Sequence, residues 1–166
     1  MALTGQRSTF LLYERETGKP VTPLISWRDR RGEPWIDRLD DEQFDKIKRI
    51  TGLRPEAGYP LSKICWLFEE DDGLFQQAQS GELGYGSLDS WLLYRLSTGK
   101  TWMMDPTQAS RTLLYDIEAN DWAGELLDEF SIPGEILPPV KKRLEIPVEA
   151  EAIWPDATII HTIGDQ

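Results

Sequence analysis

The sequence predicts an α/β fold that is rich in helix, with a β-hairpin near its N-terminus and a buried strand at its C-terminus. Two patterns carry this prediction. Apolar residues recur at helical spacing in the middle of the chain, most clearly over residues 61–68. The closing segment 157–164, "ATIIHTIG", is instead an almost uninterrupted run of β-branched residues, which is typical of a strand buried on both faces in a parallel sheet.

The first elements follow from local signals. Residues 8–27 contain two β-rich runs separated by "ETGK", where Gly18 can adopt the positive φ of a tight turn, and this predicts the hairpin. Gly32 and Pro34 then interrupt regular structure. A helix is expected over residues 40–50, ended by Gly52, with an apolar face formed by Phe44, Ile47 and Ile50.

Two helices are predicted in the middle of the chain after the loop "LRPEAGYP". The first has a single apolar stripe made of Leu61, Ile64, Cys65 and Phe68. For the second, Ser87 is the expected N-cap and Gly99 the expected stop. Its predicted buried face consists of Leu88, Trp91, Leu92 and Leu96.

The C-terminal part predicts one more helix before the last strand. "KTWMMDPT" reads as a short extended segment closed by Pro106. A helix is expected over 121–130, capped by Asn120 or Asp121, with Trp122, Leu126, Leu127 and Phe130 facing inward. Five prolines over 131–155 indicate a tether with a short helical turn. Because the closing strand then lacks predicted neighbours, the chain either borrows strands from another copy or lacks strands of a larger sheet, so a homo-oligomer stays open.

Composition excludes several classes of function. The 166 residues suffice for one domain, and the formal net charge of −11 disfavours nucleic acid and anionic membranes as partners. With Cys65 as the only cysteine and His161 as the only histidine, we expect no disulfide and no metal site of the usual zinc composition. No signal peptide is evident, and no run approaches the roughly 18 apolar residues of a membrane span. These features predict a cytoplasmic protein.

Several stretches carry a more specific signal when they are taken together and in order. They are "GQRSTFLLYERETGKPVTPLISWRDRR", "TGL", "PLSKICWLFEE", "GELGYGSLDSWLLYRLSTGK", "DPTQASRTLLYDI", "DW", "IPGEILPPV" and "GDQ". The set covers nearly the whole chain, and it resembles the FGGY family of carbohydrate kinases, most closely the glycerol kinase branch. "SKICWLFEE" and "GSLDSWLLYRLSTGK" are its most specific members.

The resemblance implies a fold and an activity. The fold is that of a ribonuclease-H-like, actin-like ATPase, and residues 1–166 look like an incomplete N-terminal, substrate-binding domain. The family's nucleotide-phosphate loop and its C-terminal domain are absent from the chain, and no Walker-type Gly-rich loop is present. The implied reaction transfers the γ-phosphate of ATP, with Mg²⁺, to a hydroxyl of a sugar or polyol. We expect the chain alone to be inactive.

The resemblance also implies which residues act. Asp165, at the carboxyl end of the closing strand, matches the aspartate that accepts the proton of the attacking hydroxyl. Ligands bind at such strand ends in open α/β sheets, although a turn acid that bonds its own backbone is the alternative. Arg7 matches the arginine that hydrogen-bonds substrate hydroxyls, with a surface arginine as the alternative.

Four more residues are candidates for binding the substrate, and two positions depart from the glycerol kinase pattern. Trp27 matches a tryptophan that lines the pocket, with a core residue as the alternative. Asp29 could reach a hydroxyl or only order its neighbouring arginines. Ser8 stands where glycerol kinases carry a glutamate. Gly58 replaces a tyrosine, which Tyr59 would restore after a shift of one residue. The identity of the polyol is therefore open.

A different class of function competes with the kinase. The chain could be a non-catalytic, acidic, Trp-rich module that binds a protein or a carbohydrate, or a degenerate kinase fragment. Apart from Trp27, the tryptophans fit packing better than chemistry. Ser110 and Arg111 are interpreted as a structural lock between a helix and a loop, and the acidic run "EEDDG" as a solvated helix end that lacks the ligand spacing of a calcium loop.

Overall fold

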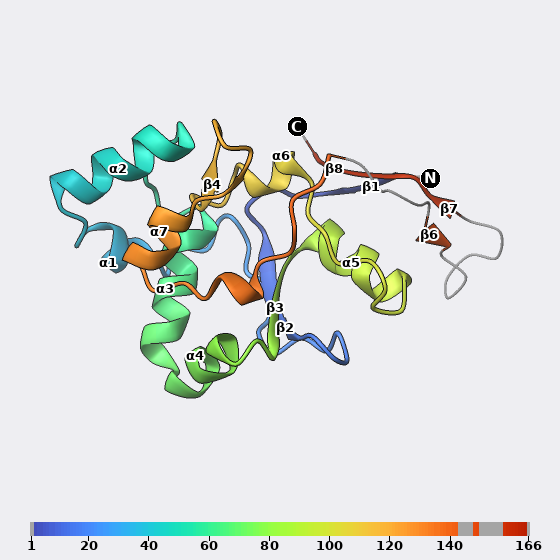
Figure 1. Ribbon diagram of the computed structural model, residues 1–166. Helices are drawn as coiled ribbons and strands as arrows, with labels where there is room; N and C mark the ends of the chain where they lie inside the picture. Colours follow the sequence, from blue (N-terminus) through green and yellow to red (C-terminus); the bar gives the residue numbers. More distant parts are fainter. Residues whose placement is uncertain (1, 143–147, 150–157, 166) are drawn as a thin grey trace.

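Strand pairing in the computed structural model brings the two ends of the described chain together (Figure 1). The structure describes residues 2–142, 148–149 and 158–165. In chain order the elements are β1 (Ala2–Gly5), β2 (Phe10–Glu14), α1 (Glu33–Ile36), α2 (Asp41–Thr51), α3 (Pro60–Glu70), α4 (Asp72–Gln79), β3 (Leu83–Ser87), α5 (Leu88–Leu96), α6 (Pro106–Ala109), β4 (Tyr115–Asp116), β5 (Asp121–Trp122), α7 (Gly124–Glu129), the 3₁₀ turn η1 (Gly134–Ile136), β6 (Val148–Glu149), β7 (Thr158–Ile159) and β8 (His161–Gly164). The predicted α/β class is confirmed.

The strands form two-stranded pairs. β1 and β8 are parallel, with Ala2 opposite His161 and Gly5 opposite Gly164. β2 and β3 are antiparallel, as are the short pairs β4–β5 and β6–β7. In Figure 1, β1 and β8 extend to one side, away from the body that contains α1 to α4 and α7.

The predicted N-terminal hairpin is wrong in the strand that it pairs with β2. Gly18 does turn the chain with φ +68°, but the second run meets β2 only through isolated bridges at Pro20 and Ile25. Pro20 and Pro23 lack the N–H that a regular ladder needs. The regular partner of β2 is β3, which sequence reasoning missed because Gly84 and Gly86 depress strand propensity.

The glycines of β3 have a packing reason. A Cβ on Gly84 would lie 2.7 Å from Cζ of Tyr13, and one on Gly86 would lie 2.9 Å from Cβ of Trp91. The two strands can pair with the Tyr13 ring lying across them only because neither position carries a side chain. Tertiary packing has therefore overridden local propensity at this strand.

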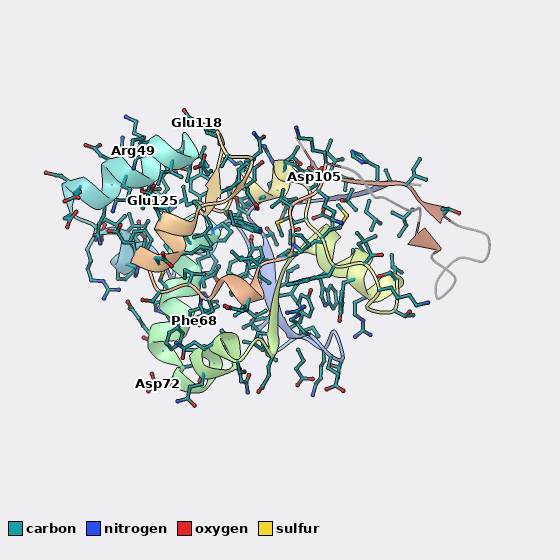
Figure 2. All side chains as sticks on the ribbon, in the orientation of Figure 1. Arg49, Phe68, Asp72, Asp105, Glu118 and Glu125 are labelled. Atoms are coloured by element: carbon teal, nitrogen blue, oxygen red, sulfur yellow. The ribbon has the colours of Figure 1, made fainter. Side chains whose placement is uncertain are left out.

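The predicted helices over 40–50 and 61–68 are confirmed. α2 begins with a capping box: the Asp40 side chain accepts from the Gln43 backbone N–H, and the Gln43 side chain accepts from the Asp40 backbone N–H. The helix ends at Gly52, which has φ +70°. α3 starts at Pro60 and buries Leu61, Ile64, Cys65 and Phe68. Arg49 of α2 reaches Glu125 of α7 at 3.6 Å, the two being labelled on neighbouring helices in Figure 2.

The buried face predicted for the next helix is wrong in register. α5 follows Ser87 and buries Leu96 as expected, but its other buried residues are Asp89, Ser90 and Leu93, whereas Leu88, Trp91 and Leu92 are half-buried. The indole Nε1 of Trp91 donates to the Gly18 carbonyl at 3.0 Å, so this side of the helix faces the β2 turn. A buried acid and a buried serine cannot be read from an apolar pattern.

The helix expected over 121–130 is shorter than predicted. Asp121 and Trp122 form β5, Ala123 is the N-cap, and α7 begins only at Gly124. Asn120 adopts φ +58° in the turn between β4 and β5, so neither Asn120 nor Asp121 caps the helix. The short helices α4 and α6 were not predicted. The helical turn in the proline-rich tether is η1, while residues 143–147 and 150–157 of that tether lie outside the described residues.

The closing strand is present but is buried on one face of the described chain, not on two. Ile159 and Thr162 are buried, whereas Ile160 and Ile163 are 61% and 40% exposed. The reason is that β8 pairs with β1 alone and packs on α5 and α6.

Two apolar clusters hold the fold. The larger one joins β2 and β3 to α2, α3, α4 and α7. The smaller one lies beside β1 and β7 and contains Leu93, Leu96, Met103 and Ile159, with Leu3 packed against it. None of the described helices is long and apolar enough to cross a membrane.

Candidate functional site

A pocket of about 460 Å³ opens where the ends of β1 and β8 meet the loops before α1 and α3. It is lined by Gln6, Arg7, Ser8, Trp27, Glu56, Gly58, Tyr59, Arg111 and Asp165. Of the residues predicted to act, the structure thus brings Arg7, Ser8, Trp27, Tyr59 and Asp165 together, although 158 positions separate Arg7 from Asp165. Asp29 is not among the lining residues.

The first wall, called here the strand-end wall, consists of Arg7 and Asp165. Because β1 and β8 are parallel and in register, their carboxyl ends lie side by side, and the Asp165 N–H donates to the Gly5 carbonyl at 3.2 Å. The Asp165 carboxylate accepts from the Arg7 backbone N–H at 3.4 Å and lies 3.8 Å from Arg7 Nε. A carboxylate and a guanidinium therefore converge on one side of the pocket.

Glycine at position 164 makes this approach sterically feasible. A Cβ there would lie 2.7 Å from both Cγ and Cδ of Arg7 and 3.1 Å from the Thr107 hydroxyl oxygen. The Gly164 N–H donates to that same hydroxyl at 2.8 Å. The strand end is thus held from one side by Arg7 and from the other by α6.

The turn after Arg7 is fixed by two hydroxyls. Ser8 has φ +59°, is only 7% exposed, and donates from Oγ to the Arg111 carbonyl at 2.9 Å. Thr9 donates to the Gln6 side chain at 3.1 Å and accepts from the Trp27 N–H at 3.2 Å. The Ser8 hydroxyl is thereby committed to holding the turn in its unusual conformation.

The second wall, called here the aromatic wall, consists of Trp27 and Tyr59. Trp27 is 44% exposed, with the Arg28 guanidinium 5.1 Å from the centre of its ring. Tyr59 is the N-cap residue of α3, and the Arg111 guanidinium lies 4.9 Å from its ring centre. Flat rings beside charged groups are a common way to bind a molecule that has an apolar skeleton and polar substituents.

Lys63 ties the two loops of the aromatic wall together from inside. It is fully buried, and its Nζ donates to the Ser26 carbonyl at 2.8 Å and to the Gly58 carbonyl at 2.9 Å. Burial lowers the pKa of Lys63 to about 8. The residues that precede Trp27 and Tyr59 therefore share one ammonium group.

Asp29 does not line the pocket, and its carboxylate is bonded to Arg31. Its carboxylate accepts two hydrogen bonds from the Arg31 guanidinium, at 3.0 and 2.8 Å. These bonds from Arg31 lower the pKa of Asp29. Of the two predictions for this residue, the structure supports the ordering of a neighbouring arginine.

Sequence reasoning missed other residues at the pocket. Gln6 and Glu56 line it without having been singled out, and Arg111 lines it in addition to accepting the Ser8 hydrogen bond. Lys63 was missed because a lysine outside the apolar stripe of this helix is typical of a surface residue. Its burial depends on the carbonyls of Ser26 and Gly58, which accept from its Nζ. Within the ranges that the structure describes, no three acidic, histidine or cysteine side chains gather to hold a metal ion.

The arrangement suits a small polyhydroxylated molecule. Guanidinium and carboxylate groups offer donors and acceptors to hydroxyl groups, while Trp27 and Tyr59 offer faces for a carbon skeleton. The Asp165 side chain, 40% exposed at the pocket, can accept a proton from a bound hydroxyl.

Comparison with known proteins gives a consistent result. Residues 1–153 match the model of the N-terminal domain of the FGGY family of carbohydrate kinases. A glycerol kinase of Dichelobacter nodosus is 42% identical over 146 residues, which is 88% of this chain and 29% of that protein. A glycerol kinase of Saccharolobus islandicus is 38% identical over 166 residues, which is the whole chain and 33% of that protein. The chain thus spans about a third of the length of these relatives.

Solved structures agree on the fold. A glycerol kinase of Plasmodium falciparum, crystallised with ADP, superposes with a TM-score of 0.86 at 28% identity over 98% of this chain and 33% of its own. A gluconate kinase of Lactobacillus acidophilus gives a TM-score of 0.82 at 23% identity over 98% of this chain and 33% of its own, a likeness of fold alone.

Proposed function

The chain belongs to the FGGY family of carbohydrate kinases, and from this premise we propose that it forms the substrate-binding part of a kinase for a sugar or polyol. The reaction would transfer the γ-phosphate of ATP to one hydroxyl of the substrate. The observation that carries the proposal is the convergence of Arg7 and Asp165 on a pocket whose other side is aromatic. The activity proposed is that of the whole protein.

Asp165 is the proposed base. The substrate hydroxyl would hydrogen-bond to its carboxylate and lose its proton to it as the oxygen attacks the γ-phosphorus, while the bond from that phosphorus to the bridging oxygen breaks and ADP leaves. Arg7 would hold a neighbouring hydroxyl and, through the 3.8 Å contact of Nε, orient the carboxylate.

Trp27 and Tyr59 are the proposed contacts of the carbon skeleton. The Ser8 hydroxyl donates to the Arg111 carbonyl, so Ser8 would shape the pocket through its backbone. Asp29 would act indirectly, by ordering Arg31 beside Trp66. With small residues at positions 8 and 58, the substrate need not be glycerol, and a larger sugar or polyol is equally compatible.

ATP and Mg²⁺ are proposed from the family. The described residues present neither a phosphate-binding glycine loop nor a cluster of metal ligands, so none of them is proposed to hold ATP or Mg²⁺. A kinase of this kind is expected in the cytoplasm, and a homo-oligomer is compatible with the paired strand ends.

Two observations favour the kinase over a non-catalytic, Trp-rich module: the family match, and the small number of exposed tryptophans on the described surface. Of the tryptophans that the structure describes, only Trp27 is among the exposed large apolar residues, and it lines the pocket. A docking surface built from several exposed aromatic residues is therefore not present on the described part of the chain.

The decisive experiment replaces the proposed base in the full-length protein. Asp165→Asn should lower kcat for ATP-dependent phosphorylation about 10²- to 10⁴-fold, measured with a panel of polyols and pentoses, because the amide cannot accept the proton. Asp72→Asn is the matched control: Asp72 is an exposed acid of α4, on the opposite side of Figure 2 from α6. Unchanged turnover in Asp165→Asn would refute the assignment.

A further inference from the structure

Beneath the strand-end wall lies a buried pair, Asp89 of α5 and Gln108 of α6. Asp89 has no exposed surface and Gln108 is 2% exposed. Nε2 of Gln108 donates to Asp89 Oδ1 at 2.8 Å and to the Gly5 carbonyl at 3.0 Å, so both hydrogens of the amide are used. The two acceptors also fix the amide orientation, because the opposite flip would place Oε1 against two oxygen atoms.

Two buried atoms of this pair are left over. Asp89 Oδ2 and Gln108 Oε1 have no hydrogen-bond partner among the described residues. If the carboxylate is ionised, both atoms are acceptors, and leaving two buried acceptors unsatisfied is unfavourable. One proton on Oδ2 would satisfy both atoms, because an acid O–H that donates to Oε1 would complete a ring of two hydrogen bonds with the bond from Nε2 to Oδ1.

The surroundings of Asp89 act on its charge in both directions. Ser87 donates to Oδ1 at 2.8 Å. The charged group that acts on Asp89 is the carboxylate of Asp105, which carries the same sign. The titratable group of β3 that faces Asp89 is the fully buried phenol of Tyr85. Burial is the largest influence and raises the pKa of Asp89. Hydrogen bonds from Ser87 and from the backbone of Asp89 and Ser90 lower this pKa, and the like charge of Asp105 raises it, so that the net shift is upward. No arginine, lysine or histidine in the described ranges forms an ion pair with it.

The pair is joined directly to the ends of β1 and β8. The Gly5 carbonyl that accepts from Gln108 also accepts from the Asp165 N–H at 3.2 Å. The preceding residue, Thr107, accepts from the Gly164 N–H at 2.8 Å. Consecutive side chains of α6 therefore hold both strand ends, and Arg7 and Asp165 follow within two residues.

We propose that Asp89 is protonated in the folded protein and forms a closed acid–amide pair with Gln108, which makes Gln108 a positioning residue for Arg7 and Asp165. The pair clamps α5, α6 and β1 together without a charge beneath the site. The protonation of Asp89 stands on the buried geometry alone, whereas the effect on turnover rests on the proposed function.

The first test measures the proton. In the full-length protein, Asp89→Asn replaces the acid O–H by an amide N–H that can donate to Gln108 Oε1. Folding of the wild type must take up a proton whenever the pH exceeds the pKa of an unfolded aspartate, so its stability falls as the pH rises from about 4 towards the raised folded pKa. The melting temperatures should agree near pH 4, and Asp89→Asn should melt increasingly above the wild type towards pH 8. A variant that melts lower at every pH would overturn the proposal.

Infrared spectroscopy gives a readout that does not depend on stability or activity. The wild type at pH 7 should show the C=O stretch of a protonated carboxyl group in a dry environment, and Asp89→Asn should lack it. The absence of this band from the wild type would overturn the proposal even if the variant folds poorly.

The second test measures positioning. Gln108→Leu should lower kcat at least tenfold at a temperature where the protein is folded and leave KM for ATP unchanged, whereas Asp89→Asn should keep wild-type turnover because the ring of hydrogen bonds survives. Gln77→Leu, at an exposed position of α4, is the control. Equal turnover in Gln108→Leu and wild type would refute the positioning role. If Asp165→Asn also turned over normally, the proposed function would fail while the infrared result still decided the proton.

Discussion

The aromatic wall of the pocket rests on the larger hydrophobic core, whereas the strand-end wall rests on a two-stranded ribbon and a polar network. Tyr59 opens α3, a helix with Leu61 and Ile64 fully buried. Arg7 and Asp165, by contrast, follow strands whose ends are held by hydrogen bonds from Thr107 and Gln108. One pocket thus combines two ways of holding a side chain in place.

The two kinds of support fix different properties of a side chain: apolar packing fixes its location, and hydrogen bonds fix its orientation. Apolar packing is strong but non-directional, so it fixes where α3 lies and tolerates small rotations. Hydrogen bonds contribute less net free energy each, but they fix direction, which a base within reach of a hydroxyl requires. We therefore expect changes under the aromatic wall to act mainly on stability, and changes under the strand-end wall to act mainly on turnover.

The largest loss of stability is expected from Ile64→Ala. Ile64 has no exposed surface, and deleting its side chain leaves a cavity in the larger core, at about 2–5 kcal/mol in the free energy of unfolding. Urea denaturation of the full-length protein measures this loss. Ile160→Ala, at a 61% exposed position of the terminal segment, should change stability by only about 0.5 kcal/mol. A fall in kcat at temperatures where Ile64→Ala is folded would contradict the expectation that changes under the aromatic wall act mainly on stability.

Sequence reasoning succeeded where structure is local. The capping box and C-terminal glycine of α2 and the apolar stripe of α3 lie within a dozen residues, and both helices were predicted. It failed where distant residues decide. β3 contains two glycines because Tyr13 lies across it, and α5 buries Asp89 because Gln108 meets it there. No local pattern contains these partners.

The candidate site divides in the same way. The strand-end rule placed Asp165 at a ligand-binding edge from sequence alone, and the motif resemblance selected Arg7, Ser8, Trp27 and Tyr59. Glu56 lies outside the motif stretches, and Lys63 lies within "SKICWLFEE" but was not selected from it. Their places became visible only once the loops before α1 and α3 were side by side.

An intermediate effect is expected from Lys63→Met. The change removes the donor for the Ser26 and Gly58 carbonyls and should lower the free energy of unfolding by about 1–3 kcal/mol. The wild type adds a pH signature. Because burial lowers the folded pKa to about 8, the unfolded chain binds more protons between pH 8 and about 10.5, so this group makes stability rise with pH in that window. Stability curves of wild type and Lys63→Met that run parallel from pH 7 to 10 would contradict the account.

A smaller loss of stability than for Ile64→Ala or Lys63→Met, with an effect on turnover out of proportion to it, is expected from Thr107→Val. The substitution keeps the shape and removes the acceptor of the Gly164 N–H, at about 1 kcal/mol. Thr51→Val is the control. The buried Thr51 hydroxyl likewise accepts from a backbone N–H, that of Leu53, and also donates to the Ile47 carbonyl at 2.8 Å, but it lies at the end of α2, away from the strand-end wall. Both variants should lose similar stability in urea, yet only Thr107→Val should lower kcat, about three- to tenfold, because only there does the freed backbone carry Asp165. Equal kcat in the two variants would mean that the β1–β8 register alone orients the carboxylate, and that the polar network beneath it serves stability just as the apolar core does.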